Sequence, residues 1–261
     1  DIRRRCNPSF IKNGKFLYYL SRRIPTPVRR KNVNIFVGKR LTFSRGNENV
    51  ILKVQSDISK KKITEHVLTK CVVSKIPEVT AVVDIFEKKD NSYIVAKQYD
   101  MDLFDFVDRN LVTKDNIYPI FKNIVEKVNI MHKNSIYHRD IKLENIVINI
   151  TETNGKETYD IRFIDFESIT VLKKAVGKCG TCFRSPPEMY YSGELYSEAY
   201  DCEKSDCFSL GVILFSLLYK ASVWDKKNLY LECYLPEDSR NPLLNKLIVK
   251  DPSKRWNTIE I

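Results

Sequence analysis

The sequence predicts an α+β fold, and two observations support that class. Between residues 16 and 98, short apolar runs separated by turn residues predict five strands, with a single helix among them. Residues 117–132 then show strong amphipathic spacing, which predicts a long helix. A strand-rich part followed by helices is typical of an α+β fold.

The length and composition suit a globular protein. The 261 residues are enough for one large domain or two small lobes with a sizeable core. The longest apolar run, Leu210–Tyr219, is too short to span a bilayer, and the first residues lead into no apolar core, so we expect neither a membrane span nor a signal peptide. Seven scattered cysteines, an odd number, predict reduced thiols and an intracellular protein of the cytoplasm or nucleus.

The net charge of +11 is concentrated near the start of the chain. Residues 1–62 hold 17 lysines and arginines against three acidic residues, whereas the other 199 residues hold 27 against 30. Such a basic part can attract an acidic partner, including nucleic acid or phosphorylated protein. The alternative, which we favour, is a solvated basic surface, because the sequence contains neither an aromatic RNA-binding motif nor zinc-finger spacing.

The first part can be divided into elements in chain order. Residues 1–15 are basic and contain turn signals, which predicts an extended arm, and residues 21–34 contain two prolines, which predicts a loop. Helical spacing predicts a helix over 58–74. The predicted strands are Phe16–Leu20, Asn34–Phe43, Asn49–Gln55, Val79–Phe86 and Tyr93–Gln98, and a polar turn over 151–158 separates two short strands later in the chain.

One stretch carries the strongest functional signal. It reads His138-Arg139-Asp140-Ile141-Lys142-Leu143-Glu144-Asn145, and Asp165-Phe166-Glu167 begins twenty residues after Asn145. Together they resemble the catalytic loop and metal-binding motif of eukaryotic-type protein kinases. The alternative for such a stretch is a polar loop between two apolar strands.

The resemblance implies phosphoryl transfer from ATP, and it assigns a role to each polar residue. Asp140 would orient the substrate hydroxyl and take its proton, and Lys142 would neutralise charge on the moving phosphoryl group. Asn145 and Asp165 would hold Mg²⁺, or Mn²⁺ in its place, because hard cations prefer oxygen ligands.

Further motifs extend the resemblance over nearly the whole chain. Lys53 ends the strand-like Val50-Ile51-Leu52-Lys53, and Glu65 on the next helix would be its ion-pair partner. The resemblance implies a bilobal fold, with an N-lobe over 16–98, a larger and mainly helical C-lobe over 99–261, and a hinge over 97–101. The other implied nucleotide contacts are Val33, Ala96 and Gln98, and the implied structural residues are His138, Arg139, Glu188, Asp206 and Arg255.

Those structural residues have specific expected partners. Asp206, which opens Asp206-Cys207-Phe208-Ser209-Leu210-Gly211, would brace the backbone of the catalytic loop. Arg255 would form a buried ion pair with Glu188, and Thr181 would bond near Asp140 and Lys142. His138 is expected to anchor the loop rather than act as a base, and His132 is expected to pack at a helix end.

Lys142 is typical of serine/threonine kinases, and the chain is most similar to the calmodulin-kinase group, in particular to the PIM type. The Lys, Asn and Ile content suits an AT-rich genome, such as that of a large DNA virus or a parasite. In these kinases acidic residues receive basic residues of the protein substrate. The residues that would do so here are Asp102, Asp105 and Glu144, with Thr181 beside the substrate groove. The alternative is that the acidic residues only solvate a helix end and a loop.

Two departures from the kinase pattern leave a pseudokinase open as the alternative function. No glycine-rich loop precedes Lys53, and Arg29, Arg30 and Lys31 would have to supply positive charge in place of backbone amides. Glu167 stands where the metal motif has glycine.

Regulation and thiol chemistry give weaker signals. Arg139 beside Asp140 is often controlled by a phosphate on the activation segment, for which the candidates are Ser168 and Thr170. Cys179 and Cys182 could form a redox pair. A zinc site with Cys202 and Cys207 is an alternative that we disfavour.

Overall fold

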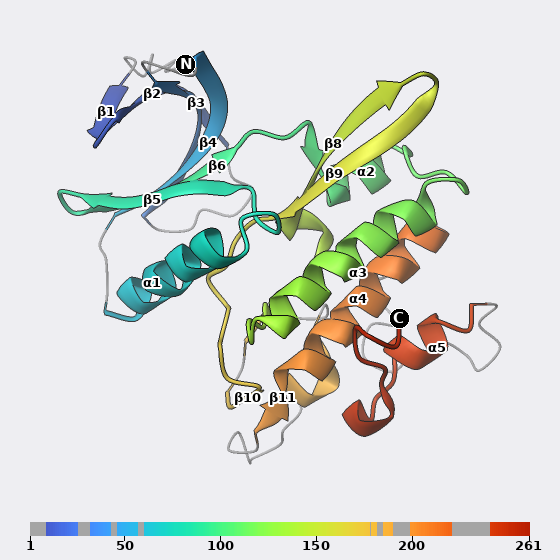
Figure 1. Ribbon diagram of the computed structural model, residues 1–261. Helices are drawn as coiled ribbons and strands as arrows, with labels where there is room; N and C mark the ends of the chain where they lie inside the picture. The colour runs from blue at the N-terminus through green and yellow to red at the C-terminus, as the bar shows by residue number, and fades with distance from the viewer. Residues whose placement is uncertain are drawn as a thin grey trace. The chain divides into compact units, whose positions relative to one another are not determined.

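The computed structural model of the protein describes residues 9–25, 32–42, 46–56, 60–177, 179–181, 185–189, 199–220 and 241–261, of which Figure 1 labels the elements. The backbone divides into two compact units, Asp1–Gln98 and Tyr99–Ile261, hereafter the first and second units. Strands dominate the first unit and helices the second, so the predicted α+β class is confirmed.

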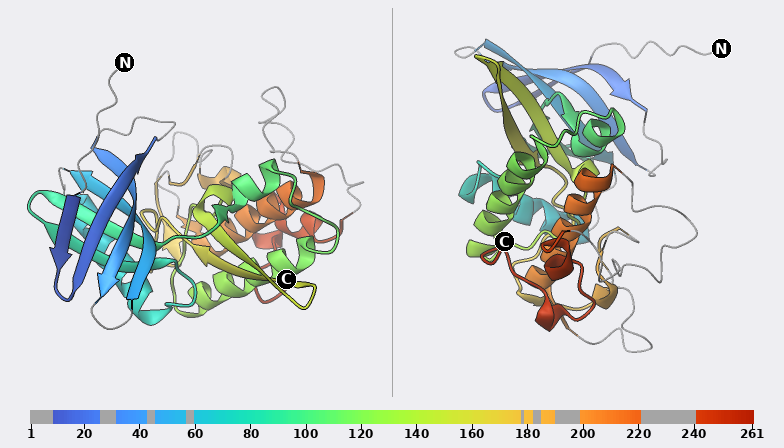
Figure 2. Two further views of the ribbon diagram at one scale, coloured as in Figure 1. Left: turned by 90° about the horizontal axis from the view of Figure 1, so that it is seen from above. Right: turned by 90° about the vertical axis from the view of Figure 1, so that its right-hand side faces the viewer.

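The described part of the first unit forms a six-stranded antiparallel sheet in the order β1-β2-β3-β4-β6-β5. Figure 2 shows strands β1 to β4 side by side. The strands are β1 (Ser9–Asn13), β2 (Phe16–Ile24), β3 (Val33–Thr42), β4 (Gly46–Ser56), β5 (Val82–Lys88) and β6 (Asn91–Lys97).

The prediction of a basic arm over 1–15 is wrong for its second half, because β1 pairs with β2 and becomes the edge of the sheet. The basic residues and turn signals of this stretch outweighed its apolar pair, Phe10 and Ile11, which would have indicated a strand. Ile11 packs against the core and the ring of Phe10 lies 5.2 Å from that of Tyr19. The predicted loop over 21–34 also begins too early, since β2 continues to Ile24 and pairs with Ile35.

One face of this sheet carries the core of the first unit. Its aromatic centre is a stack in which the ring centroid of Phe86 lies 5.4 Å from Tyr18 and 4.8 Å from Tyr93. Gly38 lets β3 approach closely there, because a Cβ at this position would lie 2.3 Å from the Tyr19 carbonyl oxygen. The other buried members are Leu20, Val50, Leu52, Val54 and Val95.

Helix α1 (Lys60–Lys75) is tied to the sheet by His66. The ring Nε2 of His66 lies 2.8 Å from Ser92 Oγ in β6, and Nδ1 lies 3.2 Å from Glu87 Oε1 in β5. This side chain is buried, so one residue of α1 fixes the helix to two strands.

The second unit is built around two long helices, α3 (Ile117–Lys133) and α4 (Cys202–Tyr219), which lie side by side in Figures 1 and 2. Helix α4 is buried on nearly all sides, which suits its almost uniformly apolar sequence after Asp206. None of the helices that the structure describes is long and apolar enough to cross a membrane. The remaining helices are α2 (Leu103–Asp108), α5 (Leu244–Leu247), η1 (Leu143–Asn145), η2 (Pro187–Met189) and η3 (Pro252–Lys254).

Short strands position the loops of this unit. A sheet of β7 (Met101–Asp102), β8 (Ile146–Thr153) and β9 (Lys156–Phe163) carries a projecting hairpin, drawn in yellow-green in Figure 1. The predicted turn over 151–158 is therefore too long, because the two strands pair up to the Thr153 and Lys156 pair. A second, two-stranded sheet joins β10 (Lys174–Ala175) to β11 (Tyr200–Asp201).

Candidate active site

The loop before η1 is held from below by one buried carboxylate, that of Asp206 at the start of α4. Its oxygens accept the backbone N–H of His138 at 2.9 Å and of Arg139 at 2.8 Å. The Asp206 side chain is fully buried. Hydrogen bonds to an ionised carboxylate are stronger than those between neutral groups. The contact predicted between Asp206 and the loop backbone is thus present in the structure.

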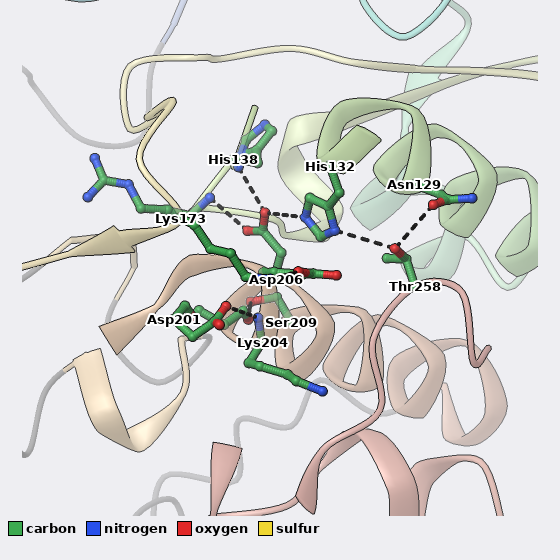
Figure 3. A network of polar contacts seen from close by, with 12 residues as sticks. Asn129, His132, His138, Lys173, Asp201, Lys204, Asp206, Ser209 and Thr258 are labelled. Carbon is green, nitrogen blue, oxygen red and sulfur yellow. Dashed lines mark hydrogen bonds and ion pairs between the residues drawn. The ribbon is translucent and has the colours of Figure 1, made fainter. Parts of the chain in front are cut away.

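His132 completes the set of donors around that carboxylate. Its Nε2 lies 3.0 Å from Asp206 Oδ2, and its Nδ1 lies 3.4 Å from Thr258 Oγ1. Figure 3 shows Asp206 between His132 and the backbone of His138. A carboxylate oxygen can only accept, so Nε2 carries the ring hydrogen. The sequence predicted a packing role for His132, and its bond to Asp206 went unpredicted.

His138 is sealed between two phenylalanine rings. Its ring centroid lies 5.5 Å from that of Phe163 and 5.3 Å from that of Phe166, and the residue has no exposed surface. Burial lowers the pKa of His138, so the ring is neutral. Its Nδ1 accepts the backbone N–H of Asp140 at 3.3 Å. A neutral, enclosed ring cannot reach a substrate, which agrees with the anchor role expected from the sequence.

Asp140, Lys142 and Thr181 form a closed triangle of hydrogen bonds. Lys142 Nζ donates to Asp140 Oδ2 and to Thr181 Oγ1, and Thr181 Oγ1 donates to Asp140 Oδ1. Each of the three distances is 2.7 Å. Thr181 comes from the segment after Asp165, so the triangle connects two distant parts of the second unit and fixes both the carboxylate and the ammonium.

Asn145 and Asp165 lie at the ends of two paired strands. The amide Nδ2 of Asn145 donates to the Asp140 carbonyl at 2.9 Å and to its carboxylate at 3.2 Å. This orientation leaves Asn145 Oδ1 as the acceptor. The backbone N–H of Ile164, the residue before Asp165, donates to the Asn145 carbonyl at 2.9 Å. One amide oxygen next to a carboxylate is a donor set that fits Mg²⁺ or Mn²⁺.

Asp165 and the residue before Asp140, Arg139, have left-handed backbone conformations. The φ angle is +61° at Arg139 and +62° at Asp165, and neither residue is glycine. Such conformations cost free energy and persist where the surroundings enforce them. The hydrogen bond from the Arg139 N–H to Asp206 holds the Arg139 conformation in place.

The ion pair predicted between Glu188 and Arg255 is present. Arg255 Nη1 lies 2.7 Å from Glu188 Oε1, and Nη2 lies 3.3 Å from Oε2. The guanidinium also donates to the Val249 and Lys204 carbonyls and lies over the ring of Phe208 at 5.0 Å. Arg255 is 1% exposed, and Glu188 supplies the opposite charge that a buried guanidinium requires.

Arg139 points towards the activation segment, which runs on from Asp165. Its Nε donates to the Ser168 carbonyl at 2.7 Å, and its Nη1 donates to the Tyr200 hydroxyl at 3.2 Å. Thr170 exchanges two backbone hydrogen bonds with Tyr137, at 2.9 and 3.0 Å. No motif in the sequence singled out Tyr200.

The three acidic residues expected at the substrate groove differ in their surroundings. Asp102 caps α2 by accepting the backbone N–H of Asp105 at 2.8 Å, and burial raises its pKa. Asp105 is about half exposed and pairs with Arg109 at 3.2 Å. Glu144 is half-buried in η1. Asp102 thus has the helix-end role that the alternative interpretation described.

Three of the predicted nucleotide residues of the first unit, Val33, Lys53 and Ala96, lie on the sheet face opposite its core. Strand pairing aligns Ile35, Lys53 and Ile94 in one row across β3, β4 and β6. It aligns Val37, Ile51 and Ala96 in the next row. Directly paired residues point to the same face, so Lys53 is surrounded by half-buried aliphatic side chains.

The register changes which aliphatic residues lie nearest to Lys53. Val33 pairs with Gln55, two positions beyond the Lys53 row, whereas Ile35 is directly opposite Lys53. Because side chains alternate along a strand, the sequence alone could have placed Ile51 on the same face as Lys53. Placing Ile35 and Val37 beside them requires the register of β3 against β4. The backbone N–H of Gln98 donates to the Asn49 carbonyl at 3.0 Å, so this N–H is already hydrogen-bonded within the first unit.

Some predicted residues lie outside the described part of the chain. These are Arg29, Arg30, Lys31 and Cys182, and Glu65 is placed in α1 without a described side chain. Among the residues that are described, no three metal-binding side chains form a group. Burial raises the pKa of the Cys202 thiol to about 12 and raises that of Cys207 as well, which disfavours thiolate ligands there.

Comparison with known proteins agrees with these features. The family model of the protein kinase domain matches residues 28–261. Serine/threonine-protein kinase CHK1 of Saccharomyces cerevisiae is 28% identical over 220 residues, which cover 76% of this chain and 40% of that protein. Calcium-dependent protein kinase 4 of Plasmodium falciparum is 34% identical over 152 residues (56% and 27%).

NUAK family SNF1-like kinase 1 of Mus musculus is 27% identical over 195 residues, which cover 69% of this chain and 28% of that protein. The chain therefore spans less than half the length of these curated relatives. The match of the family model over most of the chain, on a fold that carries the Asp140 triangle, leads to one conclusion: the chain belongs to the protein kinase domain family.

Proposed function

We propose that the protein is an active serine/threonine kinase that transfers the γ-phosphoryl group of ATP to a hydroxyl of a protein substrate. The observation that carries this proposal is the triangle of Asp140, Lys142 and Thr181, with 2.7 Å on every side. It keeps a carboxylate and an ammonium together at a partly open position, since their side chains are 15% and 12% exposed.

Each member of the triangle has a role in the transfer. Asp140 orients the incoming hydroxyl and accepts its proton as the oxygen attacks. Lys142 stabilises negative charge on the phosphoryl oxygens during transfer. Thr181 holds both groups in place, so a substrate hydroxyl meets a site that needs no rearrangement.

Asn145 and Asp165 are the residues that would hold Mg²⁺, or Mn²⁺ in its place. The orientation of the Asn145 amide supports this assignment, because its nitrogen is engaged by Asp140 and its oxygen is the remaining donor. When bound, the cation would neutralise phosphate charge. In the first unit, Lys53 would bind the phosphates, Glu65 would pair with Lys53, and the aliphatic row of Val37, Ile51 and Ala96 would contact the adenine.

For the substrate, we propose a basic peptide. Asp105 is about half exposed, and a rim carboxylate of this kind attracts arginine. Glu144 lies in η1, directly before Asn145, which places a second acidic residue near Asp140. A relationship to PIM-type kinases within the calmodulin-kinase group, a viral or parasite origin and an intracellular site of action are also proposals, which rest on the sequence.

An acidic partner of the first unit is a separate proposal. Its support is the set of exposed cations on the β1–β2–β3 edge of the sheet: Lys12, Lys15, Arg22, Arg23 and Lys39. Nucleic acid and phosphorylated protein both suit such a surface by charge. Binding that weakens steeply with salt would support it.

A direct assay tests the kinase proposal. Labelled ATP, Mg²⁺ and an arginine-rich serine peptide are mixed with the protein, and the same peptide with alanine for serine is the control. Transfer to the first peptide alone is the expected result. If folded protein binds ATP but transfers no phosphate to any peptide, the protein is a pseudokinase and the proposal fails.

A further inference from the structure

Tyr200 is a hydrogen-bond partner of Arg139, the residue for which a phosphate on the activation segment was the expected partner. Its hydroxyl accepts a hydrogen bond from Arg139 Nη1 at 3.2 Å, and Arg139 directly precedes Asp140. The tyrosine is 6% exposed and packs with Tyr137, Ala175, Met189 and Cys202. The guanidinium of Arg139 is half-buried, so leaving its donors unpaired would be costly, and such acceptors stabilise it.

The same region binds the activation segment at four successive places. Arg139 Nε holds the Ser168 carbonyl at 2.7 Å, and Tyr137 exchanges two backbone bonds with Thr170. The Cys202 N–H donates to the Lys173 carbonyl at 2.8 Å. Tyr200 pairs with Ala175 in the β10–β11 sheet.

An ion pair adds to these backbone contacts, with Lys173 Nζ 2.9 Å from Glu203 Oε2. All of these contacts are made by unmodified side chains and peptide groups, without a phosphate. An added phosphate is therefore unnecessary to join the segment to the catalytic loop.

We propose that Tyr200 is a positioning residue for the transfer reaction. It holds Arg139, and through it the backbone of Asp140, in the working position when neither Ser168 nor Thr170 is phosphorylated. The role in catalysis rests on the proposed kinase function, whereas the ordering of the segment does not. Tyr200 acts through Arg139 and does not touch the reacting atoms.

Hydrogen exchange on the unphosphorylated full chain tests the ordering. The protein is treated with a phosphatase, and its intact mass verifies that no phosphate remains. The amides of Thr170 and Cys202 are expected to exchange at least about a hundredfold more slowly than in an unstructured peptide. Exchange at the unstructured rate, with protection gained only on phosphorylation, would overturn the proposal, and this measurement requires no variant.

Kinetics test the positioning role. Tyr200→Phe removes only the hydroxyl and should lower kcat for peptide phosphorylation roughly tenfold, leaving the KM for ATP and the melting temperature nearly unchanged. Tyr219→Phe is the control, because it also removes only a hydroxyl, but from the exposed end of α4, where Tyr219 is 47% exposed. If both variants retain wild-type kcat, Tyr200 has no positioning role.

The two arms separate this inference from the proposed function. A protected segment in a protein without transferase activity would refute the kinase proposal and leave the ordering by Tyr200 intact. Activity that disappears on dephosphorylation and returns with phosphate on Ser168 or Thr170 would refute the inference and leave the kinase proposal intact.

Discussion

Lys142 Nζ lies 2.7 Å from Asp140 Oδ2, so the cation expected to stabilise the transferred group also fixes the carboxylate expected to accept the proton. Asp140→Asn keeps the shape of this contact but removes the charge. We predict that kcat for peptide phosphorylation falls by about 10² to 10⁴, since that is the range for a lost acid–base group. Initial rates at saturating ATP measure it.

The control for this variant is Asp115→Asn, at an exposed position before α3. It should leave kcat unchanged, and both variants should melt within a few degrees of the wild type. An Asp140→Asn protein with more than about a third of wild-type activity would contradict the role assigned to Asp140.

Gly180 gives a second prediction, because it is packed against the catalytic loop. A Cβ at this position would lie 2.6 Å from the Arg139 carbonyl oxygen and 2.4 Å from Ser185 Oγ, and φ is +78°. Gly180→Ala should therefore displace the neighbouring Thr181 from Asp140 and Lys142. We predict at least a tenfold loss of kcat, measured with the same peptide assay.

Gly155→Ala is the matched control for that experiment. Its φ of +73° makes alanine comparably strained, about 1 kcal/mol, but a Cβ there would meet nothing within 4 Å. Equal kinetic effects of the two substitutions would show that backbone strain, rather than displacement of Thr181, causes the loss.

The buried pair of Arg255 and Glu188 predicts a large effect on stability. Arg255→Ala leaves the carboxylate of Glu188 without its partner and empties a fully buried site, so the free energy of unfolding should fall by about 3–5 kcal/mol. Arg109→Ala breaks an exposed pair with Asp105 and should cost less than about 1 kcal/mol. Urea denaturation of both variants measures the difference, and similar losses would contradict the interpretation.

Two buried histidines predict the direction of the pH dependence. Burial lowers the pKa values of His138 and His66 below the ordinary 6.5, so the unfolded chain binds more protons than the folded one. Stability should therefore fall as the pH decreases below 6.5, by up to about 1.4 kcal/mol per pH unit for each histidine.

Urea denaturation at pH 7.5, 6.5 and 5.5 checks this dependence. His66→Gln retains hydrogen-bonding capacity at a site beside Glu87 and Ser92 but cannot titrate, so its stability should vary less with pH than that of the wild type. Identical slopes for the two proteins would exclude a contribution from His66.

The resemblance to protein kinases predicted several long-range contacts, and the structure contains them. Asp206 beneath the loop, Arg255 with Glu188, and Thr181 beside Lys142 are each found at the expected position. These contacts join charged or strongly polar groups, whose burial requires specific partners. Glu188 and Arg255 are 67 positions apart, so the motif resemblance, rather than any local pattern, identified them as partners.

Other features could not be predicted from the sequence, because their residue types are common and belong to no motif. A tyrosine such as Tyr200 fits many positions, and only the pairing of β10 with β11 brings it to Arg139. The aliphatic row beside Lys53 depends on strand register, which a single residue does not specify. Strand β1 was missed because its apolar pair lies in a stretch, residues 1–15, that holds five basic residues and two turn signals.

The buried carboxylate of Asp206 also connects the far end of the chain to the centre of the second unit. Thr258 contacts His132, His132 contacts Asp206, and Asp206 accepts the N–H groups of the two peptide bonds that flank His138. A truncation that removed the last four residues would break the first contact of this relay. A substitution at Thr258 could then alter the position of Asp140, more than a hundred positions away, although no residue of the catalytic loop is changed.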